Sequence, residues 1–313
     1  MLDISVIIVT RNTCPLTCAA IESVVSGQDS PSREIFLVDN GSTDETPAVV
    51  AKRHPSVHQL RNDRNLGFAR ANNLAARNAQ GQFLLLLNSD AVLQPESLAA
   101  AVHWMRAHPD CGAAGVQLLN PDGSPQNSIA NFPTLATELL NKSLLRRLWP
   151  RRYPGKEQRF AEPVEVETVV GACMIIRRDL WDAIGGLDER YFFFFEETDF
   201  CLQTRRLGKH VMHLPQITVS HGQGQTAKKD SPAARIEYWR SRYIYFAKHH
   251  GLGVRLTLTT GLLLRLFANS LASGLMLALT LGRSGRWQNK WQVNSALCLW
   301  HLRGMPQQMG LPR

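Results

Sequence analysis

Short apolar runs alternate with longer amphipathic segments over residues 4–108 of the chain. The runs are rich in β-branched and other apolar side chains, as expected for strands buried on both faces of a parallel sheet: residues 4–10, 35–39, 57–61 and 83–87. The segments between and after them have the composition and end signals of helices: residues 18–25, 43–54, 68–79 and 95–108. This alternation predicts an α/β fold with a mostly parallel central sheet and helices on both faces.

The pattern changes at residue 120. Residues 120–163 are rich in Pro, Asn and Arg, and we expect them to form a variable excursion across the front of the sheet. Strand character returns over residues 164–176 and in a last short strand at residues 210–213. Helices are expected over residues 179–184 and from residue 196 to residue 208.

The C-terminal segment has a different character. Residues 252–281 are strongly apolar and are interrupted by Arg255 and Arg265. The longest uncharged stretch, residues 266–282, has 17 residues, fewer than the roughly 20 that a membrane-spanning helix needs. We therefore favour helices that lie in the membrane interface over a span at residues 266–282, with basic residues and Trp287, Trp291 and Trp300 as anchors.

The positive charge is concentrated in the same segment. The chain has a net charge of +9, and residues 228–313 contain 13 Lys and Arg against two Asp and Glu. A basic, apolar-rich segment is typical of a protein that binds an anionic membrane surface, and we favour this partner over nucleic acid. We expect a cytoplasmic protein that is peripheral on the cytoplasmic face of the inner membrane.

The cysteines and the N-terminus agree with a cytoplasmic location. Six cysteines in 313 residues, with no C-x-x-C pair, predict neither a disulfide scaffold nor a structural zinc site. The N-terminus has no basic segment followed by a long apolar run, so we expect no secretory signal.

Three polar clusters follow predicted strands, at residues 10–12, 39–44 and 88–90. Ligands of open α/β sheets bind beyond the carboxyl ends of the strands. Any one cluster can be a turn or a helix cap, but three at matching positions favour a ligand site. The first strand is followed by no glycine-rich phosphate loop, so a diphosphate here needs a metal or basic side chains, and Asp90 is a candidate ligand for Mg²⁺ or Mn²⁺.

An acidic cluster provides a candidate general base. Glu196, Glu197 and Asp199 follow five consecutive aromatic residues at 191–195. An apolar environment and like charges raise the pKa of a carboxyl group, as suits a general base. The alternatives are that the acidic residues cap a helix and that the aromatic residues are core, instead of lining an acceptor site. His221 has glycines on its C-terminal side; a lone histidine is usually structural, but this flank suggests a loop shaped around a ligand.

Seven motifs, in order and correctly spaced, resemble those of the family 2 glycosyltransferases, which are nucleotide-sugar-dependent, inverting enzymes of the GT-A type. They are residues 6–12, 38–46, 65–73, 86–90, 171–174, 185–189 and 194–202. The likeness runs from residue 4 to about residue 250. It is greatest to the branch that builds bacterial surface polysaccharides, including rhamnosyl- and galactosyltransferase-like members.

The resemblance implies a fold and two substrates. Residues 1–227 would form a GT-A domain, the Rossmann-like fold of nucleotide-diphospho-sugar transferases. Its nucleotide-sugar half would end near residue 119, and residues 120–227 would bind the acceptor. Residues 228–313 would be a helical, membrane-associating extension. The donor would be a UDP- or dTDP-sugar, and the acceptor a lipid-linked or glycan hydroxyl in cell-surface glycan synthesis.

The resemblance also assigns roles to individual residues. Glu197 would be the catalytic base, with Asp199 and Glu196 as possible substitutes because the family often has Asp at the base position. Asp90, in a motif that matches D-x-D, would bind Mg²⁺ or Mn²⁺, and His221 would complete the metal site. The nucleotide-sugar would be held by Thr10, Asn12, Asp39, Asn40, Arg64, Asn65, Gly67, Asn72 and Asn88.

Two other functions compete with this interpretation. A sugar-nucleotide nucleotidyltransferase has a similar nucleotide pocket, but it needs a glycine-rich triphosphate loop after the first strand, which this chain lacks. A catalytically degenerate membrane-associated scaffold is supported only by Asn88, which replaces the first acidic residue of D-x-D, and the intact acidic cluster argues against it.

Overall fold

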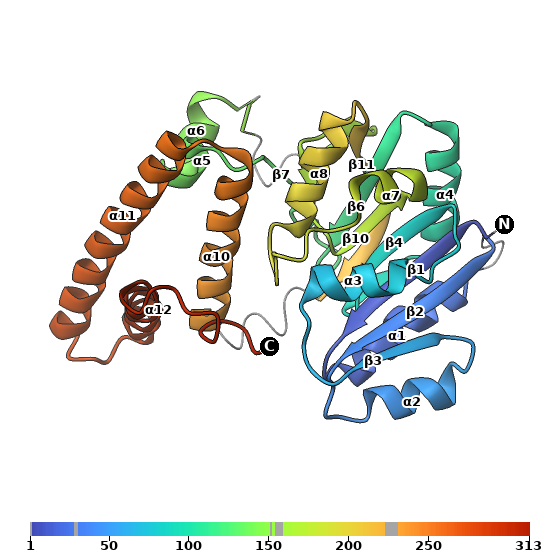
Figure 1. Ribbon diagram of the computed structural model, residues 1–313, viewed down its shortest axis with the longest axis horizontal. Coiled ribbons are helices and arrows are strands. Elements are labelled where there is room, and N and C mark those ends of the chain that lie inside the picture. The colour runs from blue at the N-terminus through green and yellow to red at the C-terminus, as the bar shows by residue number, and fades with distance from the viewer. Residues whose placement is uncertain (1, 28–30, 151, 154–158, 223–230) are drawn as a thin grey trace. The chain divides into compact units, whose positions relative to one another are not determined.

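A computed structural model describes residues 2–27, 31–150, 152–153, 159–222 and 231–313 of the chain (Figure 1). The chain divides into two compact units. Unit 1 consists of Met1–Phe132, Pro154–Phe192 and Glu196–Gln223, and unit 2 consists of Pro133–Tyr153, Phe193–Phe195 and Gly224–Arg313.

Unit 1 is built on a nine-stranded sheet with the order β3-β2-β1-β4-β10-β6-β11-β5, in which β8 also pairs with β11. The strands are β1 (Ile4–Thr10), β2 (Arg33–Asn40), β3 (His58–Asn62), β4 (Phe83–Asn88), β5 (Ala91–Leu93), β6 (Cys111–Leu119), β8 (Val164–Glu165), β10 (Cys173–Arg177) and β11 (His210–His221). Strands β3, β2, β1 and β4 run parallel to one another, and β6 runs parallel to β11. Strand β10 runs antiparallel to β4 and β6, and β5 and β8 run antiparallel to β11. The carboxyl ends of β1, β2 and β4 therefore meet at one edge.

Helices cover both faces of this sheet. The helices of unit 1 are α1 (Cys14–Val25), α2 (Thr46–Arg53), α3 (Phe68–Ala76), α4 (Ser97–Ala107), α7 (Arg178–Ile184) and α8 (Glu196–Arg206). Successive side chains of β1 point to opposite faces, so Ile4, Val6 and Ile8 join one core with α1, α2 and α4, whereas Ile7 joins a second core with α3, α7 and α8. The expected α/β fold class is confirmed.

Two strands of the nine-stranded sheet are missing from the sequence prediction, and a third is longer than predicted. Strands β5 and β6 were not predicted, although residues 111–119 are mostly apolar and seven of the nine are buried. Strand β11 does not end at residue 213 but continues to His221, with a register shift between Leu214 and Thr218. Pro215 interrupts the pattern there without ending the strand. His221 is therefore the last residue of a strand and not part of a loop.

Helix α2 starts three residues later than residue 43, where the sequence predicted its start. The helix begins at Thr46, because the Asp44 carboxylate accepts hydrogen bonds from the backbone N–H and the hydroxyl of Thr46, at 3.1 and 2.5 Å. Residues 43–45 are thereby held at the tip of β2. The region 120–163 includes one short strand, β7 (Ile129–Ala130), and the helices α5 (Leu135–Leu139) and α6 (Lys142–Leu148) of unit 2; β8, which pairs with β11, begins just after it. Strand β7 pairs with β9 (Thr168–Val169) in a second small sheet.

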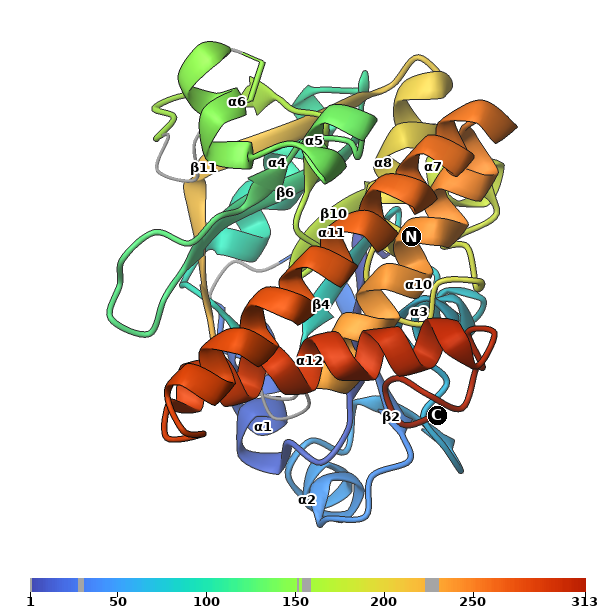
Figure 2. The ribbon, with the colours of Figure 1, turned by 90° about the vertical axis from the view of Figure 1, so that its left-hand side faces the viewer.

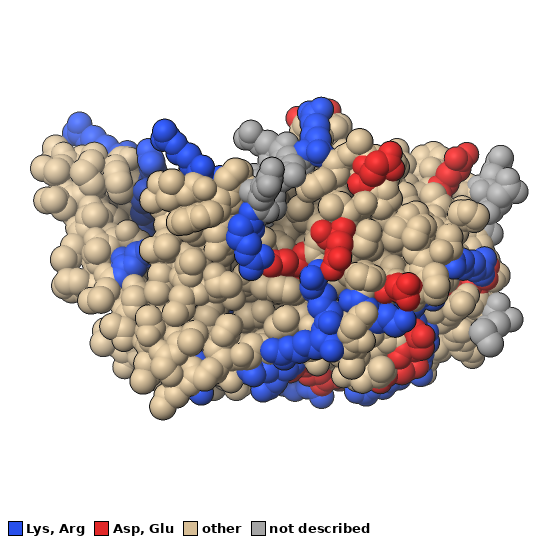
Figure 3. Space-filling view, turned by 90° about the horizontal axis from the view of Figure 1, so that it is seen from above, with Lys and Arg blue, Asp and Glu red and all other residues tan. Residues whose placement is uncertain are grey.

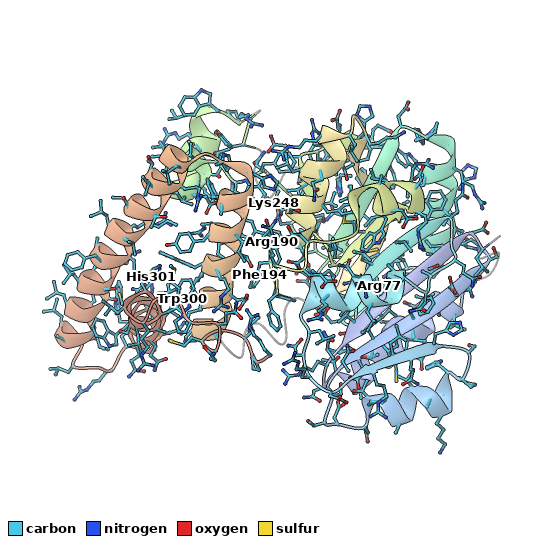
Figure 4. All side chains as sticks on the ribbon, in the orientation of Figure 1. Arg77, Arg190, Phe194, Lys248, Trp300 and His301 are labelled. Carbon is cyan, nitrogen blue, oxygen red and sulfur yellow. The ribbon has the colours of Figure 1, made fainter. Side chains whose placement is uncertain are left out.

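Unit 2 is helical (Figure 2). Besides α5 and α6 it contains α10 (Ser231–His249), α11 (Leu252–Leu279) and α12 (Gly285–Leu302). Tyr243 on α10 stacks on Trp300 of α12, and the Tyr243 hydroxyl lies 3.0 Å from Nε2 of His301, so Trp300 and His301 join α12 to α10 (Figure 4). Among the described helices, α11 alone is long and apolar enough to cross a membrane by length and composition.

Candidate active site

The tips of β1 and β2 are tied together by Asn12. Its backbone has a φ of 54°, and its side-chain oxygen accepts hydrogen bonds from the backbone N–H groups of Thr43 and Asp44, at 2.7 and 3.3 Å. The backbone N–H of Asn12 donates to Ser42 Oγ at 2.9 Å. The predicted residue Thr10 is buried just before it, with its hydroxyl 2.7 Å from that of Thr17. Thr10 and Asn12 therefore shape this edge of the sheet.

Asp39 lies at the end of β2 and faces the same edge. Its Oδ1 accepts a hydrogen bond from the backbone N–H of Ser42 at 3.0 Å, and its Oδ2 is 3.9 Å from Nε of the exposed Arg61. Gly41 has a φ of 75°, and a Cβ there would lie 3.0 Å from the Arg64 Cα. Because glycine adopts this backbone conformation easily, the Arg64 segment can approach the β2 tip.

A chain of amide groups fixes the loop that follows β3. Asn62 donates to Asn40 Oδ1 at 2.9 Å, and the Asn40 amide donates to Asn65 Oδ1 and to the Gly67 carbonyl, at 3.3 and 3.1 Å. A Cβ on Gly67 would lie 2.4 Å from the Phe192 carbonyl oxygen, so only glycine fits this position. Asn40, Asn65 and Gly67 are thus brought together, as predicted.

Asn72 is not part of the chain of hydrogen-bonded amide groups formed by Asn62, Asn40 and Asn65. It is fully buried in α3, and its amide nitrogen donates to the Phe68 carbonyl at 2.9 Å. Its Oδ1 has no hydrogen-bond partner within the described parts of the chain. A direct contact of Asn72 with a nucleotide remains a prediction.

The third cluster brings the candidate metal ligands together. Asp90 follows β4, and its Oδ1 lies 3.3 Å from Nε2 of His221 at the end of β11. The Asn88 side-chain amide is 3.4 Å from the same nitrogen. The backbone N–H of Gly222 donates to the Asp90 carbonyl at 2.9 Å, so the end of β11 is held against the motif at residues 88–90.

The sequence analysis missed Gln126, which orients His221. The buried Gln126 amide nitrogen donates to the His221 and Leu119 carbonyls at 2.6 and 3.2 Å, which fixes Oε1 as the group that faces His221 Nδ1 at 3.0 Å. Nδ1 of a neutral His221 therefore carries the proton, and the lone pair of Nε2 points toward the Asp90 carboxylate. No motif surrounds Gln126 in the sequence, and only the fold shows its contact.

Two acceptors that face each other at 3.3 Å fit a cation between them. A neutral imidazole nitrogen and a carboxylate oxygen are both ligands for Mn²⁺, and carboxylates are the preferred ligands of Mg²⁺. Among the described residues, no three His, Cys, Asp or Glu side chains come close enough to hold a metal. The protein would therefore supply Asp90 and His221, and also the Asn88 oxygen once that amide, whose Nδ2 faces His221, rotates. Other coordination positions are left to a diphosphate and water.

Glu197 lies close to this cluster. Glu197 is half-buried in the first turn of α8. A Cβ added to Gly171 would lie 3.4 Å from the Cβ of Glu197. The adjacent Ala172 carbonyl accepts a hydrogen bond from the Asn88 backbone N–H at 2.9 Å. Burial raises the pKa of the Glu197 carboxyl group, and hydrogen bonds from the backbone N–H groups of Glu197 and Thr198 oppose that rise. These opposing effects suit a general base.

The other two carboxylates of α8 have different surroundings. Asp199 is fully buried and accepts hydrogen bonds from the Gln203 amide at 2.8 Å and the Tyr191 hydroxyl at 3.4 Å. Glu196 is 5% exposed. Asp199 therefore fixes α8 and Tyr191, which leaves Glu197 as the most accessible of the three carboxylates.

Two strained residues precede α8. Phe194 and Phe195 both have a φ of 73°, a conformation that side chains with a Cβ rarely adopt. Their rings pack against Tyr238 of α10, and the Phe193 carbonyl accepts a hydrogen bond from the Ser241 hydroxyl at 2.8 Å. Of the five aromatic residues, Tyr191, Phe192 and Phe195 are buried, as expected of core side chains.

Five of the seven motifs lie wholly within a segment that matches a known family, and the acidic cluster of α8 follows that segment. Residues 5–185 match the sequence model described as Glycosyl transferase family 2. The chain belongs to glycosyl transferase family 2. The resemblance inferred from the motifs is confirmed, and the chain is a glycosyltransferase.

Family 2 relatives of known role extend beyond the matched segment. An N-acetylglucosaminyl-diphospho-decaprenol L-rhamnosyltransferase of Mycobacterium tuberculosis is 30% identical over 271 residues, which cover 80% of this chain and 86% of the relative. The O-antigen biosynthesis protein RfbC of Myxococcus xanthus is 27% identical over 255 residues, which cover 77% of this chain and 19% of that protein.

Solved structures confirm the GT-A fold of this family 2 chain. The mannosyltransferase PcManGT from Pyrobaculum calidifontis, in complex with GDP-Man and Mn²⁺, aligns over 98% of this chain and 90% of its own, with 19% identity and a TM-score of 0.57. GalNAc-T7 with UDP, GalNAc and Mn²⁺ aligns over 72% of this chain and 44% of its own, with 18% identity and a TM-score of 0.55.

Proposed function

We propose that the chain transfers a sugar from a UDP- or dTDP-sugar to a hydroxyl group of a lipid-linked acceptor, with inversion, in the synthesis of a cell-surface glycan. The observation that carries the proposal is that Asp90 and His221 present two facing acceptors at 3.3 Å, while Glu197 lies against the neighbouring β10 entry at Gly171. A diphosphate-binding cation site and a carboxylate of raised pKa are the two groups that such a transfer needs.

The residues of unit 1 account for a single displacement. Glu197 takes the proton of the acceptor hydroxyl as its oxygen forms a bond to the anomeric carbon. The bond from that carbon to the diphosphate oxygen breaks, and the nucleoside diphosphate leaves with the electron pair. Because the attack and the departure occur on opposite sides, the anomeric configuration inverts. A bound Mg²⁺ or Mn²⁺, held by Asp90, His221 and Asn88, would neutralise charge on the diphosphate.

The edge formed by β1 and β2 provides the nucleotide site. Asp39 is fixed by the Ser42 N–H and can accept hydrogen bonds from a ribose or a pyrimidine. The amide chain of Asn40 and Asn65 holds the neighbouring loop in place before the nucleotide binds. A rigid site of this kind reduces the entropy lost on binding.

The lipid-linked acceptor is supported by the relatives and by unit 2. The mycobacterial relative is named for a diphospho-decaprenol acceptor, and RfbC for O-antigen biosynthesis. Helix α11 exposes large apolar side chains to solvent, including Leu264 and Phe267, which are 66% and 63% exposed. Such a helix suits a peripheral protein that meets its acceptor at the cytoplasmic face of a membrane.

A thermal-shift screen of UDP-, dTDP- and GDP-sugars with and without Mn²⁺ tests the donor part of the proposal. A ligand that binds only the folded chain raises its melting temperature, so a UDP- or dTDP-sugar should do so, and more with Mn²⁺. Asp90→Asn should lose the additional rise in melting temperature that Mn²⁺ causes. Glu22→Gln, a change of an exposed carboxylate on α1, should keep that rise. No shift with any nucleotide sugar would contradict the proposal, and an equal shift without metal would remove the metal from it.

A further inference from the structure

Unit 2 contains a buried guanidinium group that is incompletely paired. The Arg242 side chain on α10 is 6% exposed, and its Nε lies 2.8 Å from Oε2 of Glu138, which is 4% exposed on α5. Nη1 of Arg242 has no hydrogen-bond partner in the part of the chain that the structure describes. A buried charged group with unpaired donors is destabilising, and such groups commonly have a ligand or an ordered water as partner.

Two more cations surround the same carboxylate. Nζ of Lys142 lies 3.8 Å from Glu138 Oε1, and Nη1 of Arg265 donates to the Glu138 backbone carbonyl at 2.8 Å. Partial desolvation of Arg265 and the nearby positive charge of Arg242 both lower the pKa of Arg265. Three cations thus surround Glu138, two at its carboxylate and one at its backbone carbonyl, and the cluster attracts an anion.

The cluster is open to solvent on one side. Lys142 is 55% exposed, and Arg265 is also exposed, so a line of donors leads from the surface to the buried Arg242. Guanidinium groups bind phosphate oxygens in a bidentate manner, with charge-assisted hydrogen bonds. A phosphate or diphosphate is the anion that suits two arginines and a lysine.

An apolar surface adjoins the cluster. On α11, Leu264 directly precedes Arg265 and Phe267 follows it by two residues. Leu271, Leu275 and Leu279 continue the exposed face, each between 59% and 68% exposed. In Figure 3, the visible surface of the helical unit is mostly uncharged and is interrupted by separate basic side chains. An anionic group attached to a long hydrocarbon chain matches both features at once.

We propose that Arg242, Arg265 and Lys142 bind the diphosphate of a polyprenyl-linked acceptor, whose hydrocarbon chain lies along the exposed face of α11. This inference rests on the proposed function, and it adds the site and the chemical class of the acceptor. The donor's diphosphate is assigned to Asp90 and His221 in unit 1, so the two diphosphates have separate sites on the chain.

Binding of farnesyl diphosphate to the full chain tests the proposal, with pyrophosphate, farnesol and anionic phosphatidylglycerol vesicles as the other three ligands. The chain should bind farnesyl diphosphate more tightly than pyrophosphate or farnesol. Arg265→Gln and Lys142→Gln should each weaken that binding about 10-fold or more, the usual effect of one charge-assisted hydrogen bond. Arg255→Gln, a change of another exposed arginine on α11, should leave the affinity unchanged.

Arg242→Gln leaves the buried Glu138 without its partner. The double variant Arg242→Gln/Glu138→Gln is therefore measured beside it. Melting temperatures show whether each variant is folded. A folded double variant should lose farnesyl diphosphate binding. Unchanged affinity in the Arg265, Lys142 and double variants would overturn the proposal. Equal affinity for pyrophosphate would show a free-phosphate site, and binding only to vesicles would show a headgroup site; either result would also overturn it.

Donor binding distinguishes this inference from the proposed function. The variants of unit 2 should keep the thermal shift caused by the nucleotide sugar and Mn²⁺. If the wild-type chain binds a nucleotide sugar and glycosylates a non-lipid acceptor but does not bind farnesyl diphosphate, the acceptor site proposed here is wrong while transfer from a nucleotide sugar stands. If no nucleotide sugar binds, the proposed function itself is wrong.

Discussion

The polar groups of the two units are organised in opposite ways. At the strand ends of unit 1, Asn12, Asp39 and Asn40 are hydrogen-bonded to neighbouring backbone or amide groups. In unit 2, Arg242 is buried with one unpaired nitrogen, and cations outnumber carboxylates around Glu138. The polar groups at the ends of β1 and β2 are paired before a ligand arrives, whereas the cluster around Arg242 has a donor left for the proposed diphosphate.

The two units also differ in how far their apolar side chains are exposed. Ile4, Val6 and Ile8 of β1 are fully buried, but Leu264 and Phe267 of α11 are mostly exposed. Exposed leucines over a whole helix face are characteristic of a surface that contacts lipid or another apolar partner. This contrast agrees with the proposal that unit 1 binds the nucleotide sugar and unit 2 an amphiphilic acceptor.

The largest expected effect comes from the base. Glu197→Gln should lower turnover about 10²–10⁴-fold, the usual contribution of a positioned general base, while the affinity for the nucleotide sugar stays near that of the wild type. Asp199→Asn should have a smaller effect on turnover, because Asp199 holds Tyr191 and Gln203 inside unit 1. Initial rates and donor binding measured on the same preparations provide the comparison.

The pH dependence of turnover is a second test of Glu197 as the base. Burial raises the pKa of Glu197 above its ordinary value of 4.5, so the base is protonated and inactive at a higher pH than an exposed glutamate. Turnover should therefore fall on acidification at a pH above 4.5. An inactive Asp199→Asn variant beside a normal Glu197→Gln variant would move the role to Asp199.

The next effect tests the preorganised metal site of unit 1. Gln126→Leu removes the acceptor that fixes the proton on Nδ1 of His221, and it should weaken Mn²⁺ binding about 10–100-fold, as loss of an orienting partner usually does. Isothermal titration with Mn²⁺ and a nucleoside diphosphate measures this directly. Gln94→Leu, which removes a hydrogen bond to the neighbouring Ser220, is the matched control and should bind normally. Equal losses in both variants would indicate general damage to β11.

A smaller effect is expected at the exposed face of unit 2. Leu264→Glu or Phe267→Glu should weaken sedimentation with anionic vesicles about 10-fold, since burial of one large apolar side chain contributes about 1.5–3 kcal/mol. High salt should release part of the wild-type protein by screening its basic residues. Leu207→Glu, a change of an exposed leucine of unit 1, should have no effect. Vesicle binding that is insensitive to the α11 changes would place the membrane contact elsewhere.

The last prediction concerns the free energy of unfolding and not activity, and it involves His213 in the core of unit 1. Burial lowers the pKa of His213 from 6.5 to about 4, so the folded chain keeps this histidine neutral while the unfolded chain takes up a proton below pH 6.5. The stability that the neutral form contributes is present above pH 6.5 and is lost as the pH falls to about 4, by about 3 kcal/mol in all. Urea unfolding at pH 7 and pH 5 should show this loss in the wild type. An equally large loss in His213→Leu would assign it to other groups.

The sequence predicted well which residues meet at the carboxyl ends of the strands, because these residues directly follow apolar runs. Asp39 and Asp90 could be assigned to one edge of a sheet from strand spacing alone. Gln126 could not, since its contact with His221 joins positions 95 residues apart and no local pattern marks it. Strand β6 was missed because its alanines and glycines give a weak strand pattern.

Unit 2 was less predictable for a related reason. The basic and apolar composition of residues 228–313 indicated an amphiphilic surface, but not which side chains meet. Glu138 lies in the excursion 120–163 and pairs with Arg242, which follows it by more than 100 residues. Amphipathic patterns define a face of a helix, whereas a polar cluster built from three helices depends on their packing.

Initial-rate kinetics with both substrates varied test the central claim, that the two units bind different substrates. The substrates are a nucleotide sugar and a prenyl-diphosphate-linked saccharide, with Mn²⁺ present. Asp39→Ala should raise the KM for the nucleotide sugar and leave that for the acceptor, whereas Arg265→Gln should raise the KM for the acceptor and leave that for the nucleotide sugar. If Arg265→Gln raised only the KM for the nucleotide sugar, or if both variants raised both values equally, the division between the units would be contradicted.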